Sequence, residues 1–240
     1  MSRPLLRMDG LEFDHLPKFH NNSSFAIVGS SRSGKTDFTI KLLHNLDEVF
    51  VDGKAPSKIL YCYKIMQDKL LNLEKTVPSL TLYKGLPSLK LIKDMSSDSE
   101  ELLIVLDDLV FAAVKSPIVA ELFVSGRHYN ISLIFITQNI FEQGKYSRII
   151  SLNTCYTVLF KNVRDRTQIS RFGSQMYSGE QLHDFMRVYD KVMDTKFQYL
   201  IVDFHPYAED IFRLRNNILS DEMNIYTLDT YDHDASGINT

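Results

Sequence analysis

The stretch IVGSSRSGKTDF, residues 27 to 38, decides how this chain is interpreted. Apolar residues up to Val28 suit a buried strand, and apolar residues after Thr36 recur at the spacing of a helix. Between them, residues 29–36 fit the pattern G-x-x-x-x-G-K-[ST]. Glycine and serine contribute little to a packed core, so a loop of this composition between a strand and a helix indicates a ligand site.

The spacing within this loop follows from what a phosphate group requires. Glycines let the backbone curl so that successive N–H groups point at phosphate oxygens, and the helix that follows adds the positive end of its dipole. Lys35 can reach the β- and γ-phosphates, and the Thr36 hydroxyl can bind Mg²⁺. We therefore expect a nucleoside triphosphate with Mg²⁺, bound by Gly29, Ser30, Ser31, Arg32, Ser33, Gly34, Lys35 and Thr36.

A second signal is LLIVLDDLV, residues 102–110, in which two acids follow an apolar strand. Asp107 is expected to meet the Mg²⁺ shell beside the phosphate loop, as a carboxylate at a strand end can. Asp108 can orient or deprotonate an attacking water. Two alternatives remain: a glutamate from elsewhere as the base, and an ordinary acidic strand end.

A third signal is ISLIFITQN, residues 131–139, another apolar strand that ends in polar residues. Gln138 can hydrogen-bond the γ-phosphate or the attacking water. Just upstream, SGRHYN contains Arg127, which either reaches the γ-phosphate of a neighbouring subunit or is a surface residue of a helix. An arginine that reaches across in this way raises hydrolysis by roughly 10³–10⁵-fold.

The remaining pattern predicts an α/β fold with a mostly parallel sheet and helices on both faces, because near-continuous apolar strands alternate with helical stretches. We expect one domain over 23–219, an irregular segment over 1–22, and an acidic, mobile tail over 220–240, where no Lys or Arg occurs. The expected strands are 24–29, 58–63, 80–87, 102–110, 131–139, 154–162 and 197–206. The expected helices are 37–46, 67–76, 118–128 and a helical region that reaches Asp194, with a polar loop over 94–101.

Composition limits the classes of function. With 240 residues, 44% of them hydrophobic, the chain can bury one substantial core. Cys62 and Cys155 lie in apolar runs and are predicted to be reduced core residues of an intracellular protein. We expect no signal peptide and no membrane span, since no apolar stretch approaches about 18 residues. A net charge of −3 means that any nucleic acid must be held by local basic patches.

Several classes of nucleotide-binding protein are excluded. A GTPase needs a glycine three residues after the metal-binding acid, where this chain has Val110, and a guanine-reading motif that KNVRD does not supply. A transporter ATPase has a Ser-Gly signature before the acidic strand, whereas YSGEQ, residues 177–181, follows it. A nucleotide or small-molecule kinase remains open, because NVRDRTQISR, residues 162–171, could form a lid. The glutamine at the end of strand 131–139 favours a motor ATPase.

The chain resembles the poxvirus-type genome-packaging ATPases of double-stranded DNA viruses, including those of Polinton-like and adintovirus elements, within the FtsK/HerA superfamily. The resemblance covers most of the chain and is most specific from Arg127 to Phe141. It rests on GSSRSGKT, ILYCY, LYKGLPS, LIVLDDLV, SGRHYNISLIFITQNIF, TVLFKNVRDRTQISRFGSQMY and YLIVDFHP. Two departures are the serines at positions 30 and 31, where many relatives have Pro or Gly, and the absence of a proline in IFEQGKY.

The resemblance implies a RecA-like P-loop fold and ATP hydrolysis in a homomeric ring, of five or six subunits, that pulls double-stranded DNA into a preformed capsid. The implied partners are DNA, further copies of the chain and a capsid or portal vertex. The implied location is a viral assembly site, with cytoplasm, nucleus and virion association left open. An ATP-gated capsid-assembly factor without processive translocation is a further alternative. Two basic sets could touch DNA phosphates or could be solvated surface: Lys84, Lys90 and Lys93, and Lys161, Arg164, Arg166 and Arg171.

Overall fold

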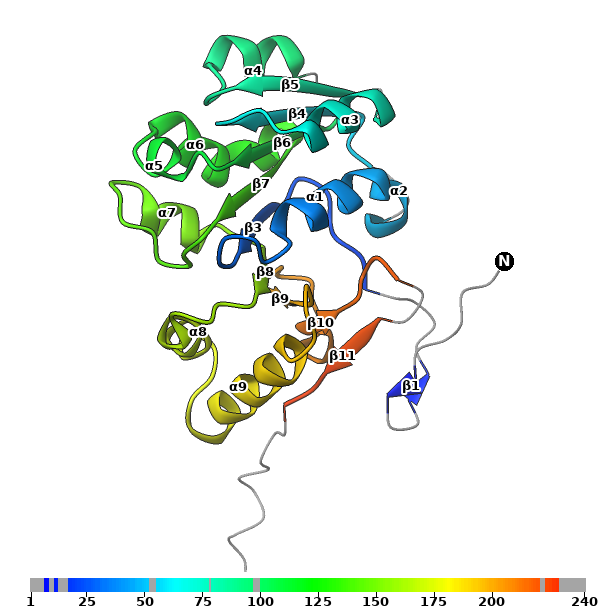
Figure 1. Cartoon of the computed structure of the whole chain (residues 1–240), viewed down its shortest axis with the longest axis vertical. Coiled ribbons are helices and arrows are strands. Elements are labelled where there is room, and N and C mark those ends of the chain that lie inside the picture. The colour runs from blue at the N-terminus through cyan, green and yellow to red at the C-terminus, as the bar shows by residue number, and fades with distance from the viewer. Residues whose placement is uncertain are drawn as a thin grey trace, which may run out of the picture.

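A computed structural model describes residues 7–8, 11–12, 17–51, 55–77, 79–96, 100–220 and 223–228 of the chain. Its centre is a nine-stranded sheet in the order β11-β10-β9-β8-β3-β7-β6-β4-β5, which Figure 1 shows running from bottom to top. A separate antiparallel pair consists of β1 (Arg7–Met8) and β2 (Leu11–Glu12). In the part of the chain that the structure describes, every helix is too short or too polar to cross a bilayer.

Six neighbouring strands of the sheet are parallel. They are β3 (Ser24–Val28), β4 (Lys58–Tyr63), β5 (Leu80–Lys84), β6 (Leu102–Asp107), β7 (Ile131–Thr137) and β8 (Tyr156–Phe160). Every residue of β6, β7 and β8 is buried, which explains why these strands read as continuous apolar runs. The predicted α/β class with a mostly parallel sheet is confirmed.

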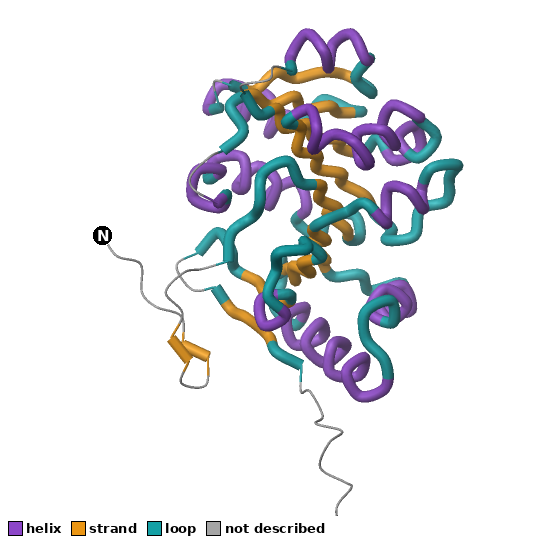
Figure 2. The backbone as a smooth tube through the Cα atoms, turned by 180° about the vertical axis from the view of Figure 1, so that it is seen from behind, coloured by secondary structure: helices purple, strands orange, loops and turns teal. Residues whose placement is uncertain are grey.

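Helices cover both faces of the sheet, as Figure 2 shows from behind. On one face pack α1 (Lys35–His44), α2 (Leu46–Val49) and α3 (Asp68–Thr76). On the other pack α4 (Leu89–Met95), α5 (Val110–Ala113), α6 (Pro117–Ser125), α7 (Ser147–Leu152), α8 (Arg166–Gly173) and α9 (Gly179–Met193). The described residues also include the 3₁₀ turns η2 (Gly126–Tyr129) and η3 (Asp210–Phe212).

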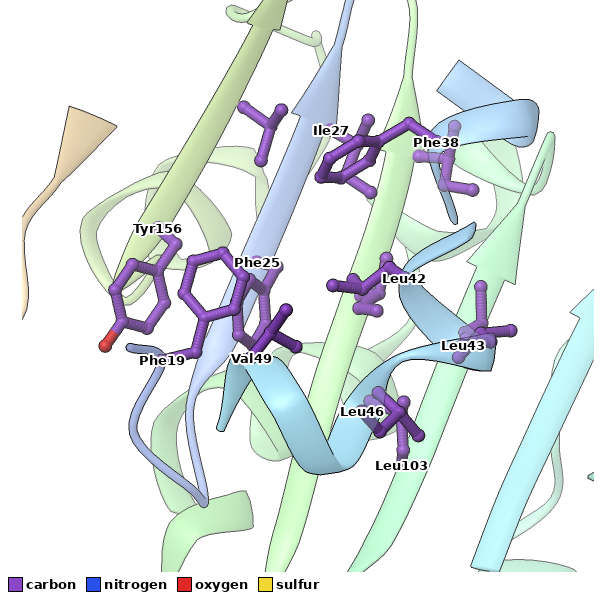
Figure 3. Close-up of a cluster of buried hydrophobic side chains, with 14 of the residues drawn as sticks. Phe19, Phe25, Ile27, Phe38, Leu42, Leu43, Leu46, Val49, Leu103 and Tyr156 are labelled. Carbon is purple, nitrogen blue, oxygen red and sulfur yellow. The ribbon is translucent and has the colours of Figure 1, made fainter. Parts of the chain in front are cut away.

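The core beneath α1 contains a cluster of aromatic rings that begins before the predicted domain does. Phe19 is fully buried, and its ring lies 4.9 Å from that of Phe25 and 4.8 Å from that of Tyr156 (Figure 3). A residue of the segment predicted to be irregular is therefore part of the core. The domain boundary predicted at residue 23 falls too late, because the turn residues around Asn22 masked the apolar anchor in front of them.

The C-terminal boundary also differs from the prediction. Three antiparallel strands extend the sheet beyond β8: β9 (Tyr199–Asp203), β10 (Leu214–Asn216) and β11 (Asn224–Tyr226). The last of them lies inside the predicted mobile tail and pairs with β10, so the boundary at residue 220 is wrong. Residues 229–240 lie outside the described part. The polar loop predicted to start at Asp94 begins later, because α4 includes Asp94 and Met95.

A buried ion pair joins two of these added strands. Arg215 on β10 is fully buried and donates to Asp203 on β9 at 2.7 Å, and also to the carbonyl of Phe212 at 2.7 Å. Its Nε and Nη2 atoms are buried without a hydrogen-bond partner among the described residues. The pair is costly to desolvate and even more costly to break, because either partner alone would be a buried, uncompensated charge.

We expect Arg215→Ala to lower the free energy of unfolding by about 3–5 kcal/mol, because it leaves the buried Asp203 carboxylate unpaired. Arg166→Ala is the matched control, since it removes an exposed pair with Asp190 and should cost less than about 1 kcal/mol. Urea unfolding followed by circular dichroism measures both. Equal losses in the two variants would contradict this role of the buried pair.

Candidate nucleotide-binding and hydrolysis site

The parallel register brings the predicted site residues to one edge of the sheet. Strand β7 pairs with β3 on one side and β6 on the other, with Val28 opposite Thr137 and Asp107 opposite Ile136. The phosphate loop, Gln138 and the two acids therefore all follow the carboxyl ends of three adjacent strands. In parallel α/β sheets this edge is where ligands bind.

The predicted phosphate loop curls between the end of β3 and the start of α1. Arg32 and Gly34 are in left-handed conformations, with φ of 63° and 105°, and α1 begins at the next residue, Lys35. Gly29 packs closely on β8, because an added Cβ would lie 2.5 Å from the Phe160 Cβ. The Ser30 hydroxyl donates to the Lys161 carbonyl at 3.0 Å, which fixes the loop to the end of the same strand.

Lys35 lies between the loop and the acidic pair. Its ammonium donates to the carbonyls of Gly29 at 2.7 Å and Ser30 at 2.8 Å. Burial lowers the pKa of Lys35, and the negative charges of Asp108 and Asp107 raise it. The Lys35 side chain therefore lies within electrostatic reach of both carboxylates, beside the loop where the phosphates are expected.

Asp107 is buried at the end of β6 and is held by a residue that the sequence analysis did not identify. The Tyr61 hydroxyl on β4 donates to Asp107 Oδ2 at 2.7 Å, and both groups are buried. Burial raises the pKa of Asp107, and the hydrogen bond from Tyr61 and the charge of Lys35 lower it. ILYCY contains two tyrosines, and Tyr63 is the residue opposite Asp107 in the register of β4 and β6, so only the structure shows that Tyr61 is the donor.

The chemistry of these side chains fits Mg²⁺. Magnesium keeps several waters and takes one or two protein oxygens together with substrate phosphates. Thr36, in the first turn of α1, and Asp107 are the residues that would hold it, and the bound ion would neutralise charge on the phosphate oxygens. No cluster of three or more acidic, His or Cys ligands occurs in the described residues, so a purely protein-bound metal centre is not indicated there.

Asp108 and Gln138 follow the ends of β6 and β7 and are exposed. Asp108 has a φ of 56°, a left-handed conformation that is uncommon for residues other than glycine and clusters at functional sites. The loop after Gln138 is held in place, since Thr137 donates to Glu142 at 2.7 Å and the Gln168 side chain accepts from the Ile140 N–H at 3.2 Å. Both predicted polar groups can thus face a ligand at this edge.

Arg127 is the one predicted catalytic residue that the fold separates from the others. It is exposed on η2, before the start of β7, so it lies at the amino edge of the parallel strands. The seven residues of β7, at about 3.3 Å each, put roughly 20 Å between that edge and Gln138. Within one subunit, Arg127 does not belong to the same site.

Of the remaining residues from the sequence analysis, the basic ones lie at the surface and Cys62 lies in the core. Lys84, Lys90, Lys93, Lys161, Arg164 and Arg171 are exposed. Arg166 pairs with Asp190 on α9. Cys62 is fully buried, and burial raises the pKa of its thiol to about 12, which suits a reduced core residue.

We expect Tyr61→Phe to weaken Mg²⁺-dependent nucleotide binding or turnover about 10- to 100-fold, because residues that orient a metal ligand commonly contribute that much. Tyr156→Phe is the matched control, since it removes another buried hydroxyl that contacts His20 at the opposite edge. Nucleotide titrations and steady-state turnover with Mg²⁺ test this. Equal effects in both variants would mean that the Tyr61 hydroxyl acts only on stability.

Comparison with known proteins places this site in a family. No curated protein sequence matches the chain significantly. Among solved structures, the genome packaging NTPase B204 from Sulfolobus turreted icosahedral virus 2 in complex with ATP-gammaS aligns with a TM-score of 0.49 and 14% identity. That alignment covers 87% of this chain and 98% of B204. The cytoplasmic domain of EssC aligns with a TM-score of 0.46 and 16% identity, over 95% of this chain and 45% of that one.

A family model described as poxvirus A32 protein matches residues 11–231, which include every predicted site residue. The match confirms the resemblance to the poxvirus-type packaging ATPases, which the motifs indicated. It extends across the whole described sheet, from before β3 to β11. This chain therefore belongs to the poxvirus A32 protein family.

Proposed function

We propose that the chain is an ATP-driven translocase that packages double-stranded viral DNA into a preformed capsid. The observation that carries the proposal is the convergence of Lys35, Asp107 and Asp108 at the carboxyl edge of adjacent parallel strands. Membership in the poxvirus A32 family supports a role as a viral packaging ATPase at a viral assembly site. The capsid or portal vertex is the partner that this role requires.

The chemistry divides among the site residues in the following way. The loop from Gly29 to Thr36 binds the phosphates of ATP, with Lys35 stabilising charge on the β- and γ-phosphates. Thr36 and Asp107 would hold Mg²⁺, which would neutralise charge on the phosphate oxygens. Asp108 is the group that orients or deprotonates the attacking water, and Gln138 contacts the γ-phosphate or that water.

The position of Arg127 supports action between subunits. It is exposed and roughly 20 Å of strand away from its own phosphate loop, so a neighbouring subunit's site is the one it can serve. At each interface, the amino edge of the parallel strands in one subunit would then meet the carboxyl edge of those strands in the next subunit. An interface of this head-to-tail kind closes into a ring when the rotation fits, here of five or six subunits.

Two basic surfaces are available for DNA phosphates. Lys161 and Arg164 follow the end of β8, beside the phosphate loop, and are exposed. Lys84 ends β5 at the same edge of the sheet. Contacts of this kind would be independent of DNA sequence and sensitive to salt, because binding releases counterions from the phosphates.

The structure gives less support to the kinase alternative. The segment 162–171, which could have formed a lid, contains the start of α8, and this helix packs on α9 through Ile169 and Phe172. Arg166, one of the arginines such a lid would use, is paired with Asp190. An ATP-gated assembly factor keeps the same site and differs only in its response to DNA.

We expect double-stranded DNA to raise the rate of steady-state ATP hydrolysis. We expect Lys35→Ala to abolish hydrolysis with and without DNA, because the substitution removes the charge that stabilises the phosphates. Phosphate release measured with and without DNA, over a range of salt, tests this. Slow hydrolysis that ignores DNA at every salt concentration would contradict translocation and favour the assembly factor. Phosphate transfer to an acceptor other than water would favour the kinase.

We expect Arg127→Ala to lower ATP hydrolysis by roughly 10³-fold or more, as for other arginines that reach a γ-phosphate. Mixing this variant with Lys35→Ala subunits should restore activity, because an intact Arg127 would then face an intact phosphate loop at some interfaces. Arg148→Ala, on α7, is a control at an exposed arginine outside the proposed catalytic and DNA-binding residues. Failure of mixing to restore any activity, in assemblies shown to contain both variants, would contradict action in trans.

A further inference from the structure

A cavity of about 480 Å³ lies beside the phosphate loop, on the side away from the acidic strand. Its lining comes from the start of α1, from the segment that leads into β9, and from the residues that follow β10. Gly34 is part of the lining, so the cavity opens next to the phosphate-binding backbone. A volume of this size is within the range of small-molecule sites.

The sheet order determines which part of a nucleotide would reach this cavity. β6 and β7, with Asp107, Asp108 and Gln138 at their ends, lie on one side of β3, and β8 and β9 lie on the other. The γ-phosphate must face the side of the acids for hydrolysis. The nucleoside at the opposite end of the triphosphate then leaves the loop on the side of β8 and β9, where the cavity lies.

Phe197 is the exposed one of the three aromatic residues that line this cavity. Its side chain is 69% exposed, and its φ of 62° is a left-handed conformation that L-residues adopt only at an energetic cost. The ring lies against the loop, since a Cβ added to Gly34 would be 3.3 Å from Phe197 Cδ1. An exposed, constrained aromatic ring beside a phosphate site is well suited to stack on a base.

Two further residues provide polar groups. Gln198 lines the same cavity, and its Oε1 is buried without a hydrogen-bond partner among the described residues. A buried acceptor that lacks a donor is costly, so a ligand that supplies a donor would be favoured. Adenine has such a donor in its 6-amino group, whereas guanine has an acceptor at the same position. Asn217 also lines the cavity.

We propose that this cavity binds the nucleobase of the bound nucleotide, with Phe197 stacked on the base and Gln198 selecting adenine over guanine. The inference rests on the proposed function, because it assigns the base end of the nucleotide whose phosphates the loop holds. Phe38 and Tyr199, with ring centroids 4.5 Å apart, form the apolar floor beneath the base.

The chain contains no tryptophan, so Phe197→Trp makes residue 197 its only tryptophan and gives a direct readout. We expect ATP to change the fluorescence of this variant through stacking, and inorganic tripolyphosphate, which has no base, to leave it unchanged. Tyr207→Trp is the control, since Tyr207 is 80% exposed and lies beyond the far end of β9. A fluorescence change at residue 207 alone, or an equal change with tripolyphosphate, would overturn the assignment.

Calorimetric titration of the full chain with Mg²⁺ and the non-hydrolysable analogue AMPPCP measures the energetics. We expect Phe197→Ala to weaken AMPPCP binding about 5- to 150-fold, as loss of one base–aromatic stack does, and to leave tripolyphosphate affinity within about twofold. Gln198→Leu should reduce the preference for ATP over GTP. An unchanged preference would overturn the role of Gln198, and unchanged AMPPCP affinity in Phe197→Ala would overturn the stack.

The same titrations separate this inference from the proposed function. If neither AMPPCP nor tripolyphosphate binds the wild-type chain, and Lys35→Ala changes nothing, the proposed nucleotide site itself fails. If both ligands bind wild type and depend on Lys35, yet the Phe197 variants bind AMPPCP as wild type does, only the nucleobase assignment fails.

Discussion

The parallel alignment of β3, β7 and β6 is the constraint on which the rest of the site depends. Each strand contributes few chemical groups, and none of the three could bind or cleave a nucleotide alone. Because the strands share one direction and are fully paired, the loop after Val28, Gln138 and the acids after Leu106 arrive at the same edge. A shift of one residue in β6 or β7 would exchange the side chains that face the two helical layers, so the packing of these side chains against both layers holds the register.

Much of this arrangement could be predicted because it depends on residues that are close together in the sequence. The phosphate loop needs only its own backbone, and strands buried on both faces are visible as apolar runs. Tyr61 could not be predicted in its role, because its contact with Asp107 depends on the pairing of strands 46 residues apart. The separation of Arg127 from Gln138 was implicit in the sequence, because Arg127 precedes the strand that Gln138 follows. Phe197 was missed because it was predicted to be the first residue of the strand over 197–206, whereas β9 begins at Tyr199.

The ends of the domain were predicted least well, and the reason is again physical. Phe19 is a single apolar anchor surrounded by turn residues, so its burial follows only from the rings of Phe25 and Tyr156 that surround it. β10 and β11 have three residues each, which is too short for an alternating pattern to stand out. The acidic composition after residue 220 suggested a solvated tail, although Ile225 at the centre of β11 is buried.

The two borders of the large sheet differ in a way that affects how copies of the chain can meet. One border is β11, with three residues, and the other is β5, where Thr81 and Lys84 are exposed. Short or charged border strands offer a poor template for hydrogen bonding to another sheet. Neighbouring molecules would therefore meet through side-chain surfaces and not through one continuous sheet. Contacts of that kind can loosen, shift and form again, whereas a backbone ladder that crossed the border would lock two molecules together.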